Sequence, residues 1–192
     1  MLNLYKTNKY NNIMLYGEAA GAEEEKQGKP FVGPSGKLLD AMLEEAGLSR
    51  EECIISNIFM SERPPNNWVN HFFVGIQEAS KNNVDYCEDI PRYNGKYLRE
   101  CFRFEMDRIR SEIEEHKPKV IVALGATAMW GIVGLNGITS RRGQQIYSRK
   151  YSVEIIPTFH PAAVLRDRKN KRDLVVEDFK LAKRLLEEPQ FS

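Results

Sequence analysis

The sequence is short of cysteine, of long apolar runs and of net charge. Its 192 residues include three widely spaced cysteines, which suit a reducing compartment and exclude a disulfide framework or a paired-cysteine metal site. No apolar run approaches the ~18 residues of a membrane-spanning helix. The first twelve residues are polar, unlike a signal peptide. We therefore expect a cytoplasmic monomer without a membrane partner.

The formal net charge of +1 is the sum of two opposed regions. Residues 1–61 contain six basic and nine acidic residues, whereas residues 141–172 contain nine basic and two acidic residues. A local basic region allows a nucleic-acid partner even when the total charge is close to zero. The length and the 42% hydrophobic content predict one globular domain spanning residues 1–192.

Short apolar runs alternate with segments of helical spacing. The apolar runs predict buried strands at residues 13–16, 53–59, 119–125 and 153–159. Helical spacing is found at residues 37–46, 97–116 and about 174–186. This order predicts an α/β fold with three layers, αβα, around a central four-stranded parallel sheet. Residues 63–94, with three prolines and scattered aromatics, are predicted to be a long loop insertion.

Three polar side chains stand at the ends of predicted strands, where parallel sheets bind their ligands. Glu18 lies among small residues that let a ligand approach the backbone. Asn57 interrupts an apolar strand, so its carboxamide needs hydrogen-bond partners and could read the edge of a base. His160 ends the last predicted strand. Each also has a structural alternative: a solvated turn carboxylate, a backbone-bonded amide and a structural histidine.

Two further regions add candidates for binding. Phe31 lies in a glycine- and proline-bounded turn and either joins the core or stacks on a flat base. Ser35 either caps the following helix or helps to hold a phosphate. The tract 164–172 is basic and led by an apolar residue. That combination suits phosphate contacts and a wedge side chain in DNA.

Several separated motifs follow one another in the order of a known family. They are Gly17 to Leu39, Ser56-Asn57, Arg63-Pro64-Pro65, Lys117 to Ala128, Arg142-Gly143 and Thr158 to Arg166. Together they resemble the uracil-DNA glycosylase superfamily, in its family 4 branch, over nearly the whole chain. The resemblance implies an enzyme that flips uracil or a modified pyrimidine out of DNA and hydrolyses its N-glycosidic bond.

The resemblance also implies roles for the residues at the strand ends. Glu18 would lie at the catalytic water and the sugar, and His160 would stabilise negative charge on the departing base. Glu24 would support the same loop, Phe31 would stack on the base and Asn57 would read its edge. DNA is the implied partner, and its contacts are expected from Ser35, Arg142, Leu165, Arg166, Arg168 and Lys169, with Leu165 or Arg166 filling the gap left in the duplex.

The chain departs from the family pattern at the first motif and at the cluster ligands. Ala20 stands where the family normally has proline, and Ala19 stands where the better-known branch has aspartate. The family's iron–sulfur cluster uses four cysteines, of which only Cys101 has a counterpart; Ser61 or Glu62 occupies another ligand position. We therefore expect no cluster and no other cofactor or metal.

These departures leave alternatives open. Ala19 and Ala20 favour a catalytically silent DNA-binding module of the same fold. The insertion at 63–94 is compatible with a modified or bulkier base, as in viral DNA, and thus with a glycosylase for hypermodified bases that acts in phage defence. The alternative that we favour for this insertion is a structural replacement for the missing cluster.

Overall fold

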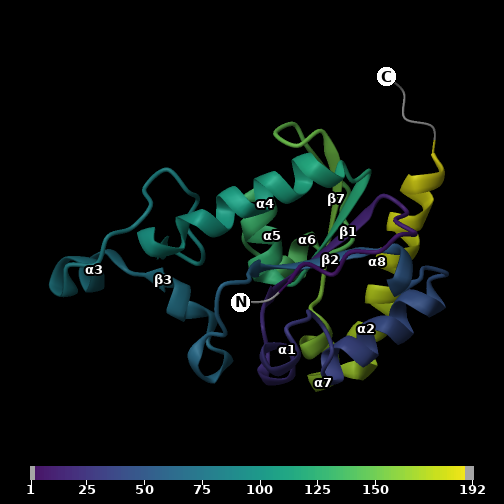
Figure 1. Ribbon diagram of the computed structural model, residues 1–192, viewed down its shortest axis with the longest axis horizontal. Helices are drawn as coiled ribbons and strands as arrows, with labels where there is room; N and C mark the ends of the chain where they lie inside the picture. Colours follow the sequence, from purple (N-terminus) through teal and green to yellow (C-terminus); the bar gives the residue numbers. More distant parts are fainter. Residues whose placement is uncertain (1–2, 189–192) are drawn as a thin grey trace.

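The computed structural model describes residues 3–188 as three layers, with a twisted sheet between two groups of helices (Figure 1). Its five strands run in the order β2-β1-β5-β7-β6. Their bounds are β1 Ile13–Ala19, β2 Ile54–Phe59, β5 Val120–Leu124, β6 Ile146–Ser148 and β7 Val153–Thr158. The three-layer αβα prediction is confirmed, and the sheet has one strand more than the four expected.

The additional strand, β6, pairs with β7 in the antiparallel direction, whereas the other neighbours in the sheet are parallel. β6 has only three residues and lies at the sheet edge, with Tyr147 57% exposed. A short edge strand needs no apolar run, because one of its sides meets solvent. The sequence pattern therefore gave no signal for it.

Eight α-helices are found in the described residues. They are α1 Ala22–Gln27, α2 Pro34–Glu45, α3 Ile76–Asn82, α4 Arg103–His116, α5 Ala126–Val133, α6 Ile138–Arg141, α7 Pro161–Arg166 and α8 Arg168–Glu187, with short 3₁₀ turns η1 Arg50–Glu52, η2 Pro65–Asn67, η3 Val69–Phe72 and η4 Glu100–Phe102. No helix among residues 3–188 is long and apolar enough to cross a bilayer.

Two of the predicted helix starts are corrected by the structure. The helix expected from residue 97 begins at Arg103, because residues 97–98 pair with another strand instead. The helix expected from about Leu174 begins at Arg168. Its first turns are exposed and basic, so they carry no apolar periodicity.

The core lies on both faces of the sheet. Helices α2, α7 and α8 cover one face, where Leu15 and Val122 are buried, and α4 and α5 cover the other, where Met14 and Ala123 are buried. Because both faces are covered, the central strands consist of continuous apolar runs. Since β1, β2, β5 and β7 are parallel, their carboxyl ends meet at one edge of the sheet.

The segment 63–94 has more structure than the predicted loop. It contains α3 and a strand, β3 (Phe73–Val74), which pairs antiparallel with β4 (Tyr97–Leu98). This part extends away from the sheet (Figure 1). Phe72 is buried, with its ring stacked 3.7 Å from that of Phe59, whereas Trp68 is 60% exposed. Aromatic packing thus fixes the segment on the core.

Candidate active site

A cleft of about 500 Å³ opens where the parallel strands end. It brings together side chains from β1, β2, the turn before α2 and the start of α7. Among its lining residues are Glu18, Glu24, Phe31, Ser35, Asn57, His160 and Arg166, all of which had been expected from the sequence to form the site.

Glu18 is the penultimate residue of β1, and its carboxylate is held by a buried hydroxyl. Thr127, in the first turn of α5, donates from Oγ1 to Oε2 of Glu18 over 2.5 Å. Burial raises the pKa of the Glu18 carboxyl, and the Thr127 hydrogen bond and the charge of Arg166 oppose that rise. The carboxylate is therefore poorly solvated but electrostatically compensated, as general bases and charge stabilisers are.

The turn that carries Phe31 is fixed by an internal carboxylate. Oε1 of Glu24 accepts hydrogen bonds from the backbone N–H groups of Val32 (3.0 Å) and Gly33 (2.8 Å). Phe31 has a φ of 53°, a left-handed conformation that is rare outside glycine and needs support from its surroundings. Glu24 provides that support.

The Phe31 ring forms one wall of the cleft. Arg50 donates to the Phe31 carbonyl over 2.9 Å, and the ring centroid lies 5.6 Å from that of His160. Gly36 passes directly under this turn, since a Cβ there would lie 1.8 Å from the Phe31 oxygen. Gly36, the third residue of α2, thus makes room for the turn, and Gly33 rather than Ser35 is the N-cap.

Asn57 presents an unsatisfied amide oxygen to the cleft. The residue is 2% exposed, and its Oδ1 has no hydrogen-bond partner among residues 3–188. A buried amide oxygen without a partner is costly. The arrangement fits a site in which a ligand supplies the missing N–H donor.

His160 is held in one tautomer by the helix that it caps. Its Nδ1 accepts the backbone N–H of Ala162 over 3.1 Å, so the proton of the neutral imidazole is on Nε2. Burial, together with the charge of Arg166, lowers the pKa of His160 to about 4. At neutral pH the ring is therefore an uncharged donor.

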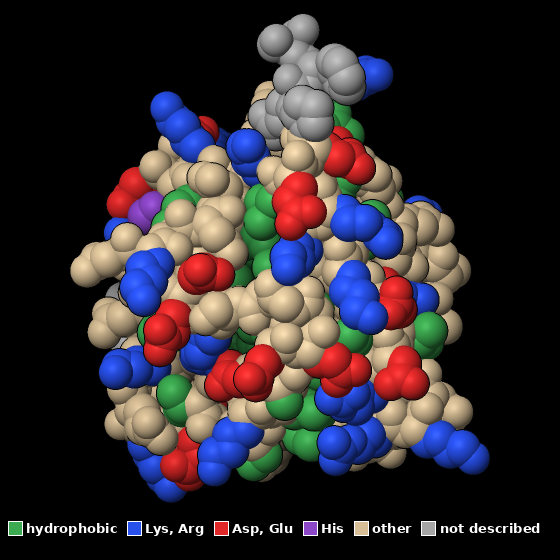
Figure 2. All heavy atoms as spheres, turned by 90° about the vertical axis from the view of Figure 1, so that its right-hand side faces the viewer, with side chains coloured by type: hydrophobic (Ala, Val, Ile, Leu, Met, Phe, Trp, Pro, Cys, Tyr) green, Lys and Arg blue, Asp and Glu red, His purple; other side chains and the backbone are tan. Residues whose placement is uncertain are grey.

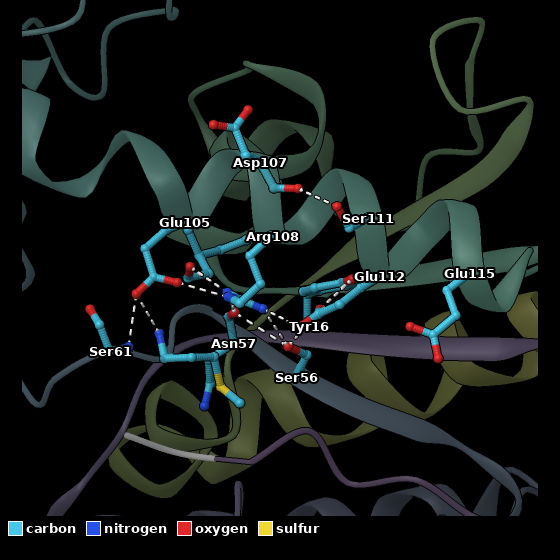
Figure 3. Close-up of polar contacts among 12 residues, drawn as sticks. Tyr16, Ser56, Asn57, Ser61, Glu105, Asp107, Arg108, Ser111, Glu112 and Glu115 are labelled. Atoms are coloured by element: carbon cyan, nitrogen blue, oxygen red, sulfur yellow. Dashed lines mark hydrogen bonds and ion pairs between the residues drawn. The ribbon is translucent and has the colours of Figure 1, made fainter.

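The strand end that carries Asn57 is anchored from behind by a buried ion network (Figure 3). Arg108 of α4 donates from Nη2 to the carbonyls of Asn57 (2.7 Å) and Ile58 (2.9 Å). Its guanidinium also pairs with Glu105 over 2.8 Å and with Glu112. One arginine therefore joins two helix carboxylates to the backbone of β2.

The two carboxylates of this network continue into the sheet. Oε1 of Glu105 accepts the N–H groups of Met60 (3.0 Å) and Ser61 (2.8 Å), and Oε2 of Glu112 accepts the Tyr16 hydroxyl (2.9 Å). Every charged group of the network thus has hydrogen-bond partners, which buried charges require. The sequence analysis did not identify this network.

The expected DNA contacts divide into two groups. Leu165 and Arg166 end α7, and Arg168 and Lys169 begin α8; all four are exposed and continue from the cleft. Arg142 lies elsewhere. Its guanidinium pairs with the buried Asp178 and donates to a backbone carbonyl over 3.0 Å, so we withdraw it from the DNA contacts.

Some basic residues of the region 141–172 lie near the cleft, and the others lie far from it or are paired with acidic residues. Arg149 and Lys150 occupy the β6–β7 turn, at the end of the sheet opposite His160. Arg172 pairs with Glu45 over 2.5 Å. Figure 2 views the right-hand side of Figure 1 and shows acidic side chains interspersed with basic ones. Among residues 3–188, Arg166 is the one arginine or lysine that lines the cleft, and Arg168 and Lys169 follow it at the start of α8.

The three cysteines do not form a ligand set for an iron–sulfur cluster, which needs four thiolates or their equivalent. The Cys53 thiol donates to the backbone of Ser49 over 3.3 Å, and the Cys87 thiol donates to Glu100 over 3.2 Å. Burial raises the pKa of both thiols to about 12. Cys101 is exposed. These residues do not fit the cluster.

The sequence analysis assigned no role to three residues at the site. Thr127 does not line the cleft but contacts Glu18, and it follows a buried strand as Glu18 does, so the strand-end argument could have found it. Pro64 and Asn67 line the cleft. They come from the start of the segment 63–94, and no periodicity or spacing relates them to the sheet edge.

Comparison with known proteins adds independent findings. The family model described as the uracil DNA glycosylase superfamily matches residues 5–180. The "Type-4 uracil-DNA glycosylase" of Thermotoga maritima is 37% identical over 174 residues, 89% of this chain and 76% of the relative. The protein of that name from Sulfurisphaera tokodaii is 34% identical over 186 residues, 93% of this chain and 71% of the relative.

Proposed function

Because the chain belongs to the uracil-DNA glycosylase superfamily, we propose that it is a monofunctional DNA glycosylase. It flips uracil or a modified pyrimidine out of DNA and hydrolyses the N-glycosidic bond, leaving an abasic site. The observation that carries this proposal is Oδ1 of Asn57, which lies beside the Phe31 ring and has no hydrogen-bond partner within residues 3–188. A flat ring bearing an N–H group satisfies both.

The cleft suits an extruded base. A base inside a duplex is out of reach of any side chain, so it must leave the stack at a cost of a few kcal/mol. Stacking on Phe31 returns about 1–3 kcal/mol. The amide of Asn57 carries a donor and an acceptor, which match the carbonyl and the N–H on the edge of uracil.

Glu18 and His160 lie at the two ends of the bond that breaks. The C1′–N bond breaks with its electron pair staying on the base, so positive charge develops on the sugar and negative charge on the base. The Glu18 carboxylate stabilises the sugar and takes a proton from the water that bonds to C1′. The Nε2–H of His160 stabilises the departing base, as an oxyanion donor does.

The DNA backbone is bound at the rim of the cleft. Arg166, Arg168 and Lys169 contact phosphates, which supply most of the non-specific affinity. Ser35 lies near the start of α2, where the backbone N–H groups favour an anion. Leu165 is 48% exposed and fills the space that the extruded base vacates, as apolar wedges do.

A substrate panel tests the proposed activity. Purified protein is incubated with single strands and duplexes that carry uracil, hydroxymethyluracil or glucosylated cytosine. Released bases are identified by mass spectrometry, and abasic sites are cleaved with alkali. We expect release of uracil or a modified pyrimidine. DNA binding without release of any base would overturn the proposal in favour of a silent module, and release of glucosylated cytosine alone would favour a role in phage defence.

Gly17 gives a prediction about the base pocket. A Cβ at this position would lie 2.3 Å from Oδ1 of Asn57 and 2.5 Å from Cζ of Phe31. We expect Gly17→Ala to displace both groups and to lower kcat/KM for uracil-containing DNA about tenfold to a hundredfold, through loss of base stacking. Steady-state kinetics measures the effect.

The control for this substitution is Gly75→Ala. A Cβ at Gly75 meets no atom within 4 Å, and the residue has a negative φ of −78°. It should therefore accept alanine without a change in kcat/KM. Equal kinetics for Gly17→Ala and the wild type would contradict the assignment of Phe31 and Asn57 to the base.

A further inference from the structure

A chain of two hydroxyl groups leads from the segment 63–94 to the catalytic carboxylate. Thr127 has one hydroxyl hydrogen, which it donates in a hydrogen bond to Oε2 of Glu18 over 2.5 Å. The Tyr93 hydroxyl lies 3.2 Å from the same Thr127 oxygen. Because the Thr127 hydrogen is already engaged, Tyr93 must be the donor in this second contact.

Tyr93 is held rigidly at its position. It exchanges two backbone hydrogen bonds with Lys96, over 2.9 and 3.0 Å. Its ring stacks on Phe73 with centroids 4.7 Å apart, and it meets the edge of Trp130 at 5.8 Å. Only 6% of the residue is exposed. The hydroxyl therefore stays aimed at Thr127 without help from a ligand.

We propose that Thr127 and Tyr93 are positioning residues that hold Oε2 of Glu18 and leave Oε1 free to meet the water. No residue between 3 and 188 donates to Oε1, whereas Oε2 is tied to α5. This inference rests on the proposed function, because it assigns the water to Glu18. It also gives the segment 63–94 a direct part in the reaction, through a residue 75 positions from Glu18.

The electrostatic balance at Glu18 makes this role measurable. Burial raises the pKa of Glu18, and the two opposing influences are the Thr127 hydrogen bond and the charge of Arg166. Tyr93 is uncharged at neutral pH, and burial raises its pKa further. His160 and Glu24 line the same cleft. Without the Thr127 hydroxyl, only the charge of Arg166 opposes the rise that burial causes in the pKa of Glu18.

The experiment measures the pKa of Glu18 directly and compares it with the rate. The side-chain carboxyl is followed by carbon NMR during a pH titration of the full chain. Single-turnover base release is measured over the same pH range. Thr127→Val and Tyr93→Phe remove one hydroxyl each, Thr127→Ser retains the hydroxyl, and Tyr10→Phe removes a buried hydroxyl that has no partner among the described residues.

We expect Thr127→Val to raise the pKa of Glu18 by about one unit, since a hydrogen bond to a charged group is lost. The acid limb of the rate profile should move to higher pH by the same amount, because only the carboxylate is active. Activity should return at alkaline pH, which a merely structural defect would not allow. Tyr93→Phe should give a smaller shift in the same direction, and Thr127→Ser and Tyr10→Phe should give none.

An unchanged pKa and acid limb in both Thr127→Val and Tyr93→Phe would overturn the inference. Tyr93→Phe keeps the ring and its packing, so it remains informative if Thr127→Val does not fold. The titration does not depend on turnover. A wild-type chain that releases no base would therefore overturn the proposed function, while the pKa of Glu18 would still decide whether the hydroxyl chain acts on it.

Discussion

Replacing His160 by alanine is expected to lower the rate of base release about 10²–10³-fold, the usual loss when one donor to a developing anion is removed. The Nε2–H is available because Nδ1 is engaged by the N–H of Ala162. The effect should appear in kcat rather than in KM, because the negative charge exists only in the transition state. Single-turnover kinetics on uracil-containing DNA measures it.

The pH dependence separates His160 from Glu18. With a pKa of about 4, His160 stays neutral from pH 5.5 upward, so the rate should show no inflection near 6.5, the ordinary value. His160→Ala should therefore lower the whole profile and leave its acid limb in place. An inflection near 6.5 that disappears in His160→Ala would contradict the neutral-donor role.

The same substitution also removes the cap of α7, which costs about 1 kcal/mol of stability. Rates must therefore be compared well below the unfolding temperature of both proteins. His116→Ala is the matched control, because His116 lies at the end of α4, outside the cleft. A comparable loss of rate in His116→Ala would show that the effect of His160 is not specific to the site.

Replacing Arg108 by methionine is expected to lower the free energy of unfolding by about 3–5 kcal/mol, the cost of breaking a buried ion pair from one side. The substitution leaves Glu105 and Glu112 without their shared cation and removes the guanidinium donor to the carbonyls of Asn57 and Ile58. Urea unfolding followed by circular dichroism measures the loss.

Arg110→Met provides the control on the same helix. Arg110 is exposed, and a surface substitution usually changes stability by less than about 0.5 kcal/mol. Folded Arg108→Met should in addition bind the base less well, because the backbone at Asn57 loses its anchor. A stability within about 1 kcal/mol of the wild type would show that the network contributes little.

The strands and the central site residues were predictable for one physical reason. Strands covered on both faces are continuous apolar runs, and parallel strands place their carboxyl ends at one edge. The sequence therefore predicts that Glu18, Asn57 and His160 meet at this edge. Their meeting follows from topology and needs no knowledge of side-chain conformation.

The Arg108 network could not be predicted because its charges lie where apolar residues are expected. Glu105 and Glu112 are buried on the inner face of α4, and only the backbone of β2 explains them. The contact between Tyr93 and Thr127 could not be predicted from the sequence either. Tyr93 reaches Thr127 through the fold of a segment that has little regular structure.

Counting charges along the sequence did not predict which basic residues are free to contact DNA. A linear tract does not reveal which residues are neutralised by partners brought in by the fold. Arg142 meets Asp178, which lies 36 residues away in the sequence. Of the basic residues in region 141–172, only those near Arg166 can act at the cleft.

The two tryptophans lie in opposite surroundings. Trp130 is 2% exposed in the core, whereas Trp68 is 60% exposed and directly follows Asn67 at the cleft. An indole in water and an indole in an apolar interior emit at different wavelengths. The chain therefore carries two built-in fluorophores, one exposed to solvent next to Asn67 and one in the folded interior, so that changes at the surface of the segment 63–94 and unfolding of the core are optically separable without a label.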